Sequence, residues 1–339
     1  MLELEEENVQ LKENTNEVKN KFLWTIHNLK FLFIPGYQLE DLNKRRMEYE
    51  LKYPKVRRIR RYKTPLFFIG ITLIFFLCTI AVFQEWISPY TFIEANVFGG
   101  WNFEIPWYAP PSPEHPLGQT FLGFDILARI IYATRPILLF TVGSTLLASV
   151  FGILIGSISG YYGGWFDVLI MRIMDIILSF PGVIFAIICI AIWGADFLIL
   201  ILIYSIIGIP YFARLIRTDV MREKELPYIN AGKVAGAKNR RIIFRHILPN
   251  CMQTYIIATS YNMSRSILSL AILGFLRLAG IGWIEWGSDL ALVLTTFTRY
   301  EYAPWAVIYP SLMILISVLG FLLLGDSLSD IGLLKHEKL

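Results

Sequence analysis

The chain has 339 residues, of which 55% are hydrophobic and only 17% are charged, and its mean hydropathy is +0.53. Soluble domains carry about 25% charged residues, so this composition argues against a soluble globular protein and favours one embedded in a lipid bilayer. The formal net charge is a modest +4, and we expect no nucleic-acid partner. The three cysteines, Cys78, Cys189 and Cys251, are far apart, which predicts free thiols and neither a disulfide framework nor a metal site.

Residues 1–63 form an extension ahead of the first long apolar stretch. An acidic start is followed by a short apolar patch from Phe22 to Phe33 and by a basic stretch that ends at Lys63. The patch is too short to span a bilayer. It predicts either an interfacial helix on the inner leaflet, with the basic stretch drawn to anionic lipid, or a partly disordered tail with one hydrophobic anchor. The sequence leaves both alternatives open.

Six later stretches are apolar enough to cross a bilayer core, which takes about 20 helical residues. The expected spans are residues 66–86, 137–160, 173–194, 197–214, 251–275 and 303–325. Only Gly194–Asp196 separates the third span from the fourth, which predicts a tight helical hairpin there. We expect an all-α membrane domain over residues 64–331, irregular structure in the loop Pro89–Pro116, which is rich in proline, and a cytoplasmic tail at 332–339.

The distribution of Lys and Arg indicates how these spans are oriented. Cytoplasmic segments of membrane proteins carry an excess of the two residues. Residues 214–245 contain nine of them and a further cluster precedes the first span, whereas residues 88–125 contain none. With six spans, this pattern places both termini and the segment 214–245 in the cytoplasm of a multi-pass protein of the cell membrane.

The segment at 226–250, between the fourth and fifth spans, is the most informative. Small residues from Ala231 to Ala237 are followed by a run of cations that includes Arg240 and Arg241. This pattern predicts a short helix, a break at Gly236 and a basic second helix, with Pro249 at the return into the membrane. Small side chains would let the backbone of a partner protein approach closely.

This segment resembles the EAA loop of ATP-binding-cassette (ABC) importer permeases, which reads Glu-Ala-Ala, three residues, Gly, and a hydrophobic stretch ending in Leu-Pro. The counterparts here are Asn230, Ala231 and Gly232 for Glu-Ala-Ala, Gly236 for the glycine, and Leu248–Pro249 for the end. Asn230 and Gly232 depart from the family pattern, and a glycine inside a helix costs about 1 kcal/mol relative to alanine. The ending His246–Asn250 is the form seen in the dipeptide, oligopeptide and nickel subfamily.

Other stretches are similar to the second (C-type) permease of that subfamily. They are Gly123–Arg129 before the second span, Gly160–Asp167 after it, and Leu324–Asp330 at the end of the sixth. The resemblance covers roughly residues 60–332 in chain order, and an extended match is far less accidental than any one motif. It implies the type I importer permease fold, with six transmembrane helices and a cytoplasmic coupling loop at 226–245.

The resemblance also implies a function, that of a non-catalytic permease subunit forming half of a pathway for peptides. The implied partners are a second permease, two ATP-binding subunits and an extracytoplasmic substrate-binding protein. ATP would be used by the partners, because this chain has no P-loop pattern, and we expect no cofactor here. The residues implied in ATPase coupling are Ile229, Asn230, Ala231, Gly232, Lys233, Gly236, Ala237, Arg240 and Arg241. The alternatives are import of oligosaccharides or nickel by the same kind of complex and, from a different class, a secondary transporter.

Arg265 lies midway along the fifth expected span. A charge at that depth costs about 2.5–3.5 kcal/mol on insertion scales, so its side chain should face protein or water. It either lines the substrate path and meets an anionic group, or pairs with a neighbouring permease or reaches one interface. Elsewhere, Arg172 and Asp175 are three residues apart on one expected helix, which predicts a local ion pair.

Overall fold

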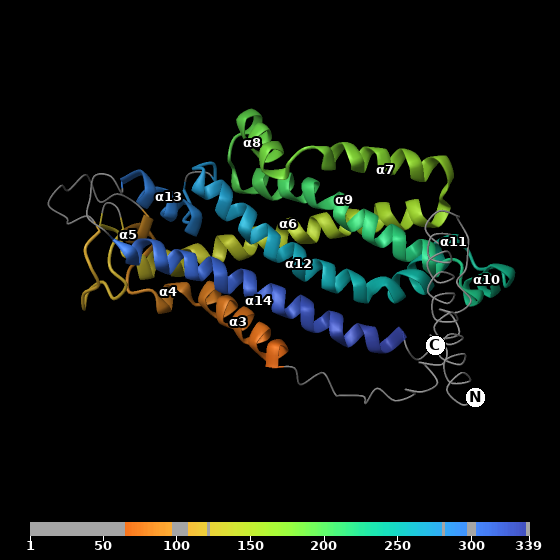
Figure 1. Cartoon of the computed structure of the whole chain (residues 1–339), viewed down its shortest axis with the longest axis horizontal. Helices are drawn as coiled ribbons and strands as arrows, with labels where there is room; N and C mark the ends of the chain where they lie inside the picture. The colour runs from red at the N-terminus through yellow and green to blue at the C-terminus, as the bar shows by residue number, and fades with distance from the viewer. Residues whose placement is uncertain (1–64, 97–107, 121–122, 280–281, 297–302, 337–339) are drawn as a thin grey trace, which may run out of the picture. The chain divides into compact units, whose positions relative to one another are not determined.

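The computed structural model describes residues 65–96, 108–120, 123–279, 282–296 and 303–336 (Figure 1). The predicted extension at 1–63 lies outside these residues. Within them every named element is helical, and extended pairing is limited to one isolated bridge between Gln119 and Asp125. The longer helices are α3 (Pro65–Val82), α6 (Ile126–Tyr162), α7 (Gly164–Ser179), α8 (Gly182–Trp193), α9 (Phe197–Glu223), α12 (Leu248–Phe275), α13 (Trp286–Thr296) and α14 (Pro304–His336). The shorter ones are α4 (Gln84–Ile87), α5 (Phe92–Asn96), α10 (Pro227–Val234), α11 (Asn239–Arg241) and the π-helix η3 (Ile242–Ile247).

Among the described residues, five helical stretches are long and apolar enough to cross a membrane, and the bent pair α7–α8 makes a sixth if it counts as one span. The stretch expected as the third span, 173–194, is thus bent within its length, because α7 and α8 meet at an angle of 84°. The bend lies at Phe180–Pro181, where Phe180 has extended backbone angles (φ −91°, ψ 131°). A residue before proline is driven out of the helical region by the proline ring.

Helix α6 packs along α9 through a row of glycines on one face. Gly152, Gly156 and Gly160 are spaced four residues apart, and a side chain on any of them would collide with α9. A Cβ at Gly160 would lie 2.8 Å from the carbonyl oxygen of Arg217. Small residues at this spacing let two helix backbones approach closely, which is how helices associate where lipid offers no hydrophobic drive.

A second layer joins α12, α14 and α3, which lie side by side in Figure 1. Helix α12 continues directly from α11 and η3, so the helical stretch runs without interruption from 239 to 275. The expected basic helix before Pro249 is present as α11 and η3, and it continues into α12 without a break. Pro249 falls in the first turn of α12 and cannot donate to the carbonyl of Arg245, and the wider turns of η3 end there.

At one end of this bundle, which we call the α13 end, buried polar contacts connect helices distant in sequence. Nε of Arg129 donates to Oδ1 of Asp289 at 2.9 Å, and Nη1 donates to the carbonyl of Ala95 at 2.8 Å. Asp125 caps α6 by accepting from the backbone N–H of Ala128, and its other carboxylate oxygen lies 3.0 Å from Nδ1 of His115. These contacts join α5, α6 and α13.

Two further differences from the sequence expectation concern the loop Pro89–Pro116 and the end of α14. The loop Pro89–Pro116 contains the short helix α5, so its described part is not wholly irregular. Helix α14 continues to His336, eleven residues past the expected end of the last span at 325. Asp326, beyond that end, accepts a hydrogen bond from the hydroxyl of Tyr261 on α12. This contact ties the additional turns of α14 to the bundle.

Candidate coupling segment and transport cavity

The other end of the bundle, which we call the α10 end, carries α10, α11 and η3 (Figure 1). Ile229 of α10 is only 1% exposed and packs in a cluster with Ile216 and Val220 of α9 and Ile243 and Ile247 of η3. Burying such a side chain contributes about 1.5–3 kcal/mol. Ile229 thus fastens α10 to the membrane helices, and its side chain is not on the free surface of the segment.

A polar contact holds the start of α10 in the same place. The hydroxyl of Tyr228 donates to Glu223 at the end of α9 and accepts from Nδ2 of Asn250 on α12, both at 2.8 Å. Burial, together with the hydrogen bond to Glu223, raises the pKa of Tyr228 to about 12. The phenol therefore stays protonated near neutral pH and keeps donating to the carboxylate.

Two contacts join the segment 226–250 to α6. The hydroxyl of Tyr161 donates to Oδ1 of Asn239 at 2.9 Å, and the ammonium of Lys233 lies 5.9 Å from the centre of the Tyr161 ring. Between these contacts Gly236 has φ +80°, and the amide of Ala237 donates to the carbonyl of Gly232. Gly236 thus follows the end of α10 in the left-handed backbone conformation, which glycine adopts without strain.

The predicted coupling residues thus divide into an anchored side and a free side. Ile229 is buried, and Gly232 and Ala237 are half-buried. The free side consists of exposed residues: Asn230, Ala231, Lys233, Gly236, Arg240 and Arg241. Val234, which the sequence analysis did not single out, is 90% exposed at the tip of α10. An exposed apolar side chain, on a segment that also exposes Lys233, Arg240 and Arg241, is available there to a partner protein.

A cavity of about 700 Å³ lies between α9, α12 and the α7–α8 bend. The polar residues in its lining are Tyr204, Tyr211, Arg214, Thr218, Asn262, Arg265, Ser266 and Ser269. The apolar residues and glycines in the lining are Leu178, Gly182, Val183, Ile207, Gly208 and Leu215. The four polar residues of α12 follow helical spacing and share one face of that helix.

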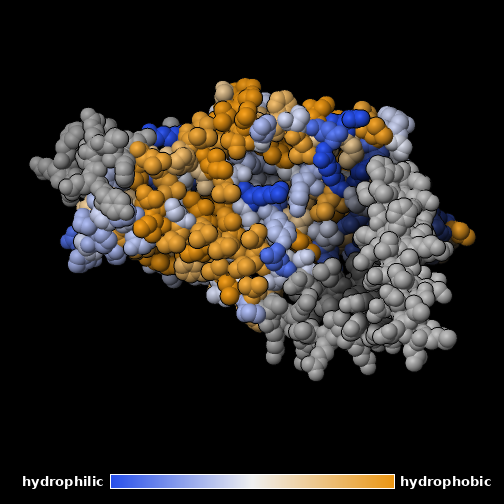
Figure 2. Space-filling model, in the orientation of Figure 1, coloured by the Kyte–Doolittle hydropathy of each residue, from blue (hydrophilic) through white to orange (hydrophobic). Residues whose placement is uncertain are grey.

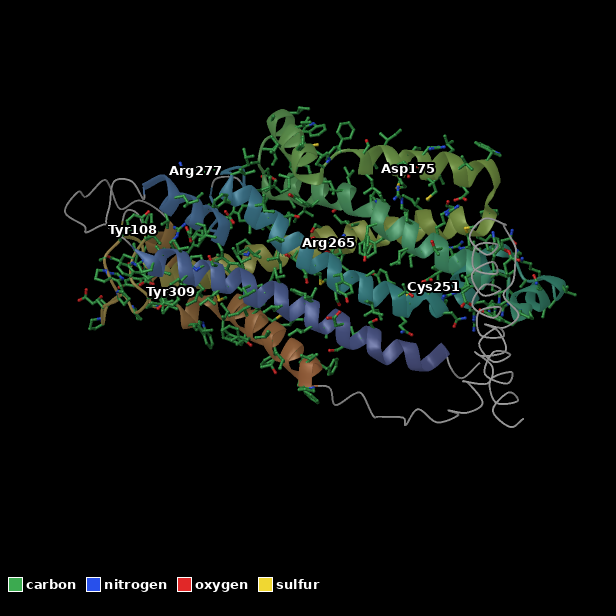
Figure 3. The ribbon with its side chains drawn as sticks, viewed as in Figure 1. Tyr108, Asp175, Cys251, Arg265, Arg277 and Tyr309 are labelled. Atoms are coloured by element: carbon green, nitrogen blue, oxygen red, sulfur yellow. The ribbon has the colours of Figure 1, made fainter. Side chains whose placement is uncertain are left out.

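Arg265 lies in this cavity, midway along α12. Its guanidinium carbon is 5.5 Å from the centre of the Tyr211 ring, and no acidic side chain of the described residues forms an ion pair with it. Figure 2 shows a strongly hydrophilic patch within an apolar surface, at the position where Figure 3 labels Arg265. The exposed guanidinium opens onto the cavity rather than the protein interior.

Comparison with known proteins identifies the family. Residues 152–331 match the family of binding-protein-dependent transport system inner membrane components. The dipeptide transport system permease protein DppC of Alkalihalophilus pseudofirmus is 36% identical over 269 residues, which are 79% of this chain and 85% of that protein. The chain belongs to this family. It is a multi-pass permease subunit of an ABC importer and functions within a larger transport complex.

Two further relatives support the same assignment of this permease. The DppC protein of Haemophilus influenzae is 37% identical over 265 residues, which are 77% of this chain and 88% of that protein. The glutathione transport system permease protein GsiD of Pectobacterium atrosepticum is 39% identical over 221 residues, covering 65% and 72% of the two chains.

The permease also has ion pairs that sequence reasoning missed. Arg217 of α9 makes two hydrogen bonds to the carboxylate of Asp167 on α7, of 2.5 and 2.6 Å. The predicted pair of Arg172 with Asp175 is present at 3.9 Å, but Arg214 of α9 contacts Asp175 more closely. Both stronger pairs connect α7 to α9 across long sequence separations, so helical spacing gave no signal for them. Within the described residues, no group of His, Cys, Asp and Glu is arranged to hold a metal ion.

Proposed function

We propose that this permease forms half of the translocation pathway of an importer for peptides. The relatives named above support this, because their names refer to transport of dipeptides and of glutathione, a tripeptide. Import of oligosaccharides or nickel by the same kind of complex is the alternative. The cavity between α9 and α12 supports the peptide assignment, because it combines an apolar wall with hydrogen-bonding side chains.

The proposed complex contains a second permease, two ATP-binding subunits and an extracytoplasmic substrate-binding protein. This chain holds no cofactor in the proposal, and its partners bind and hydrolyse ATP. The α10 end and both chain termini face the cytoplasm. The nine Lys and Arg residues between 214 and 245 support this orientation, since such residues are retained on the cytoplasmic side.

The single observation that carries the coupling role is the division of the segment into an anchored and a free side. The free side, with Val234 at its tip, docks on an ATP-binding subunit. Because Ile229 and Tyr228 fix α10 to α9 and η3, movement of the ATP-binding subunits is transmitted to the spans. The two ATPase states must bind α10 differently, since only differential affinity shifts a conformational equilibrium.

Substitution of Val234 tests this role without disturbing the fold, because its side chain is 90% exposed. Val234→Asp should abolish stimulation of ATPase activity by loaded binding protein while the complex still co-purifies. Val234→Leu is the matched control and should retain stimulation. Gly236→Trp, which strains a position with φ +80°, should behave like Val234→Asp. Full stimulation in an assembled Val234→Asp complex would refute the coupling role.

A further inference from the structure

The cavity beside Arg265 has an unbalanced charge. Its lining includes two arginines, Arg214 and Arg265, and no aspartate or glutamate. Arg214 contacts the carboxylate of Asp175, so its charge is compensated within the chain. Arg265 has the ring of Tyr211 as its neighbour and no acidic partner among the described residues. The cavity therefore presents one uncompensated cation.

The surroundings of Arg265 fit a carboxylate better than a single-atom anion. A guanidinium offers parallel N–H groups that match the two oxygens of a carboxylate. The guanidinium of Arg265 lies over the ring of Tyr211, which can hold it by a cation–π contact without using its N–H groups. Ser266 and Asn262, one residue after and three residues before Arg265 on α12, also line the cavity. They place hydroxyl and amide groups on the same helix face.

The rest of the cavity suits the remainder of a short peptide. Leu178, Val183 and Ile207 form an apolar wall that can take a side chain. With no acidic residue in the lining, nothing there would hold an ammonium group or a divalent metal ion. The uncompensated charge of Arg265 would instead repel Ni²⁺. Since this chain is proposed to form half of the pathway, groups that meet the peptide amino terminus belong on the other half.

We propose that Arg265 is the site at which the C-terminal carboxylate of a short peptide binds during its passage through this permease, with the last side chain against Leu178, Val183 and Ile207. This inference rests on the proposed function, because it requires that the α9–α12 cavity opens to the translocation pathway. It selects peptides with a free C-terminus as cargo, and it disfavours metal ions and C-terminally amidated peptides.

The test uses the complete transporter in lipid vesicles with its binding protein. The probes are an equimolar mixture of dipeptides with free C-termini and the same mixture as C-terminal amides, with ATP-driven uptake measured by mass spectrometry. Since the binding protein is the same throughout, its own preference cancels when variants are compared by their ratio of acid to amide uptake. Arg265→Gln should lower that ratio on the order of tenfold, as expected for loss of a charged hydrogen bond, whereas Arg265→Lys should keep most of it.

Arg172→Gln is the matched control, because Arg172 is an exposed arginine on α7 outside the cavity. It should leave the ratio unchanged. An Arg265→Gln complex in which acid and amide uptake fall together, or in which neither falls, overturns the carboxylate site; an equal fall is the result expected if Arg265 pairs with the second permease instead. A wild-type complex that hydrolyses ATP and imports no free dipeptide overturns the peptide function itself, and with it this inference.

Discussion

The hydroxyl of Tyr161 donates to Oδ1 of Asn239 at 2.9 Å, joining the last turn of α6 to the start of α11, 78 residues later in the chain. The same tyrosine ring lies under the ammonium of Lys233. Because α6 is packed along α9, this contact gives the coupling segment a second attachment to the bundle, beside that of Ile229. In the proposed coupling mechanism, movement of α10 would therefore reach α6 as well as α9.

Removal of the Tyr161 contacts should loosen this transmission. Tyr161→Phe loses a hydrogen bond with a net value of about 1 kcal/mol, which is roughly a fivefold change in a coupled equilibrium. Tyr161→Ala also loses the ring beneath Lys233 and should have a larger effect. We expect the number of peptides transported per ATP hydrolysed to fall in that order, measured in reconstituted vesicles.

The neighbouring Tyr162 provides the control, because it is 59% exposed. Tyr162→Phe should transport as wild type. Wild-type coupling in Tyr161→Ala would show that α6 takes no part in transmission and that α9 and α12 carry it alone.

Two glycines of α6, one inside the glycine row and one outside it, predict different effects for the same substitution. A Cβ at Gly156 would collide with the backbone carbonyl of Ala213 on α9, and backbone cannot rotate away. Overpacking of this kind costs about 1–3 kcal/mol, so Gly156→Ala should lower the unfolding midpoint in detergent. At Gly143 the nearest atom to an added Cβ is Cδ1 of Ile201 at 3.4 Å. Gly143→Ala should be neutral or stabilising by up to about 1 kcal/mol. Equal midpoints for the two variants would contradict the close packing of α6 on α9.

The sequence anticipates features that depend on local pattern and misses those that depend on pairing. Apolar length locates the membrane helices, and small residues around Gly236 mark the break after α10. The bend at Phe180–Pro181 has a local signal in its proline, but the absence of charge from Ile176 to Trp193 makes the stretch look like one span. The ion pair of Arg129 with Asp289 joins residues that are 160 positions apart. A single sequence gives no signal that these two residues are in contact.

The candidate sites follow the same rule. Arg265 stands out in the sequence because charge is rare in an apolar span, but the cavity beside it depends on how α9, α12 and the α7–α8 bend pack. The assignment of the proposed coupling segment rests on its sequence pattern and stays a prediction. That Ile229 faces inward while Val234 faces outward follows only from the packing of α10 on α9 and η3.

Arg129 and Asp289 should show strong energetic coupling, because both side chains are buried. Asp289→Asn leaves a buried guanidinium without its counter-charge and should destabilise the protein by about 3–5 kcal/mol. Arg129→Met strands the carboxylate and should cost a similar amount. The double variant Arg129→Met with Asp289→Leu should lose much less than the sum, since apolar pairs replace buried ion pairs well. Unfolding of all four proteins in detergent gives the coupling energy, and additive losses would show that the pair is not energetically linked.

Glu285 should make stability depend on pH at the α13 end. Its carboxylate caps α13 by accepting from the amides of Gly287 and Ser288. Burial, with a smaller contribution from the charge of Asp289, outweighs these donors and raises the pKa of Glu285 from 4.5 to about 7. The folded protein therefore holds a proton that the unfolded chain releases between pH 4.5 and 7, so this contribution to stability is lost as the pH rises through that window.

The comparison of wild type with Glu285→Gln isolates this effect, because glutamine stays neutral and keeps an oxygen that can accept from Gly287. The difference of about 2.5 between the two pKa values corresponds to about 3 kcal/mol. Relative to Glu285→Gln, the wild type should lose up to this amount between pH 4.5 and 7 and change little above pH 7. Since all other carboxylates are shared, they cancel in the difference of unfolding free energies measured in detergent. A difference that stays constant across this window would mean that Glu285 titrates in the folded protein as it does in the unfolded chain, and that its burial is relieved by water.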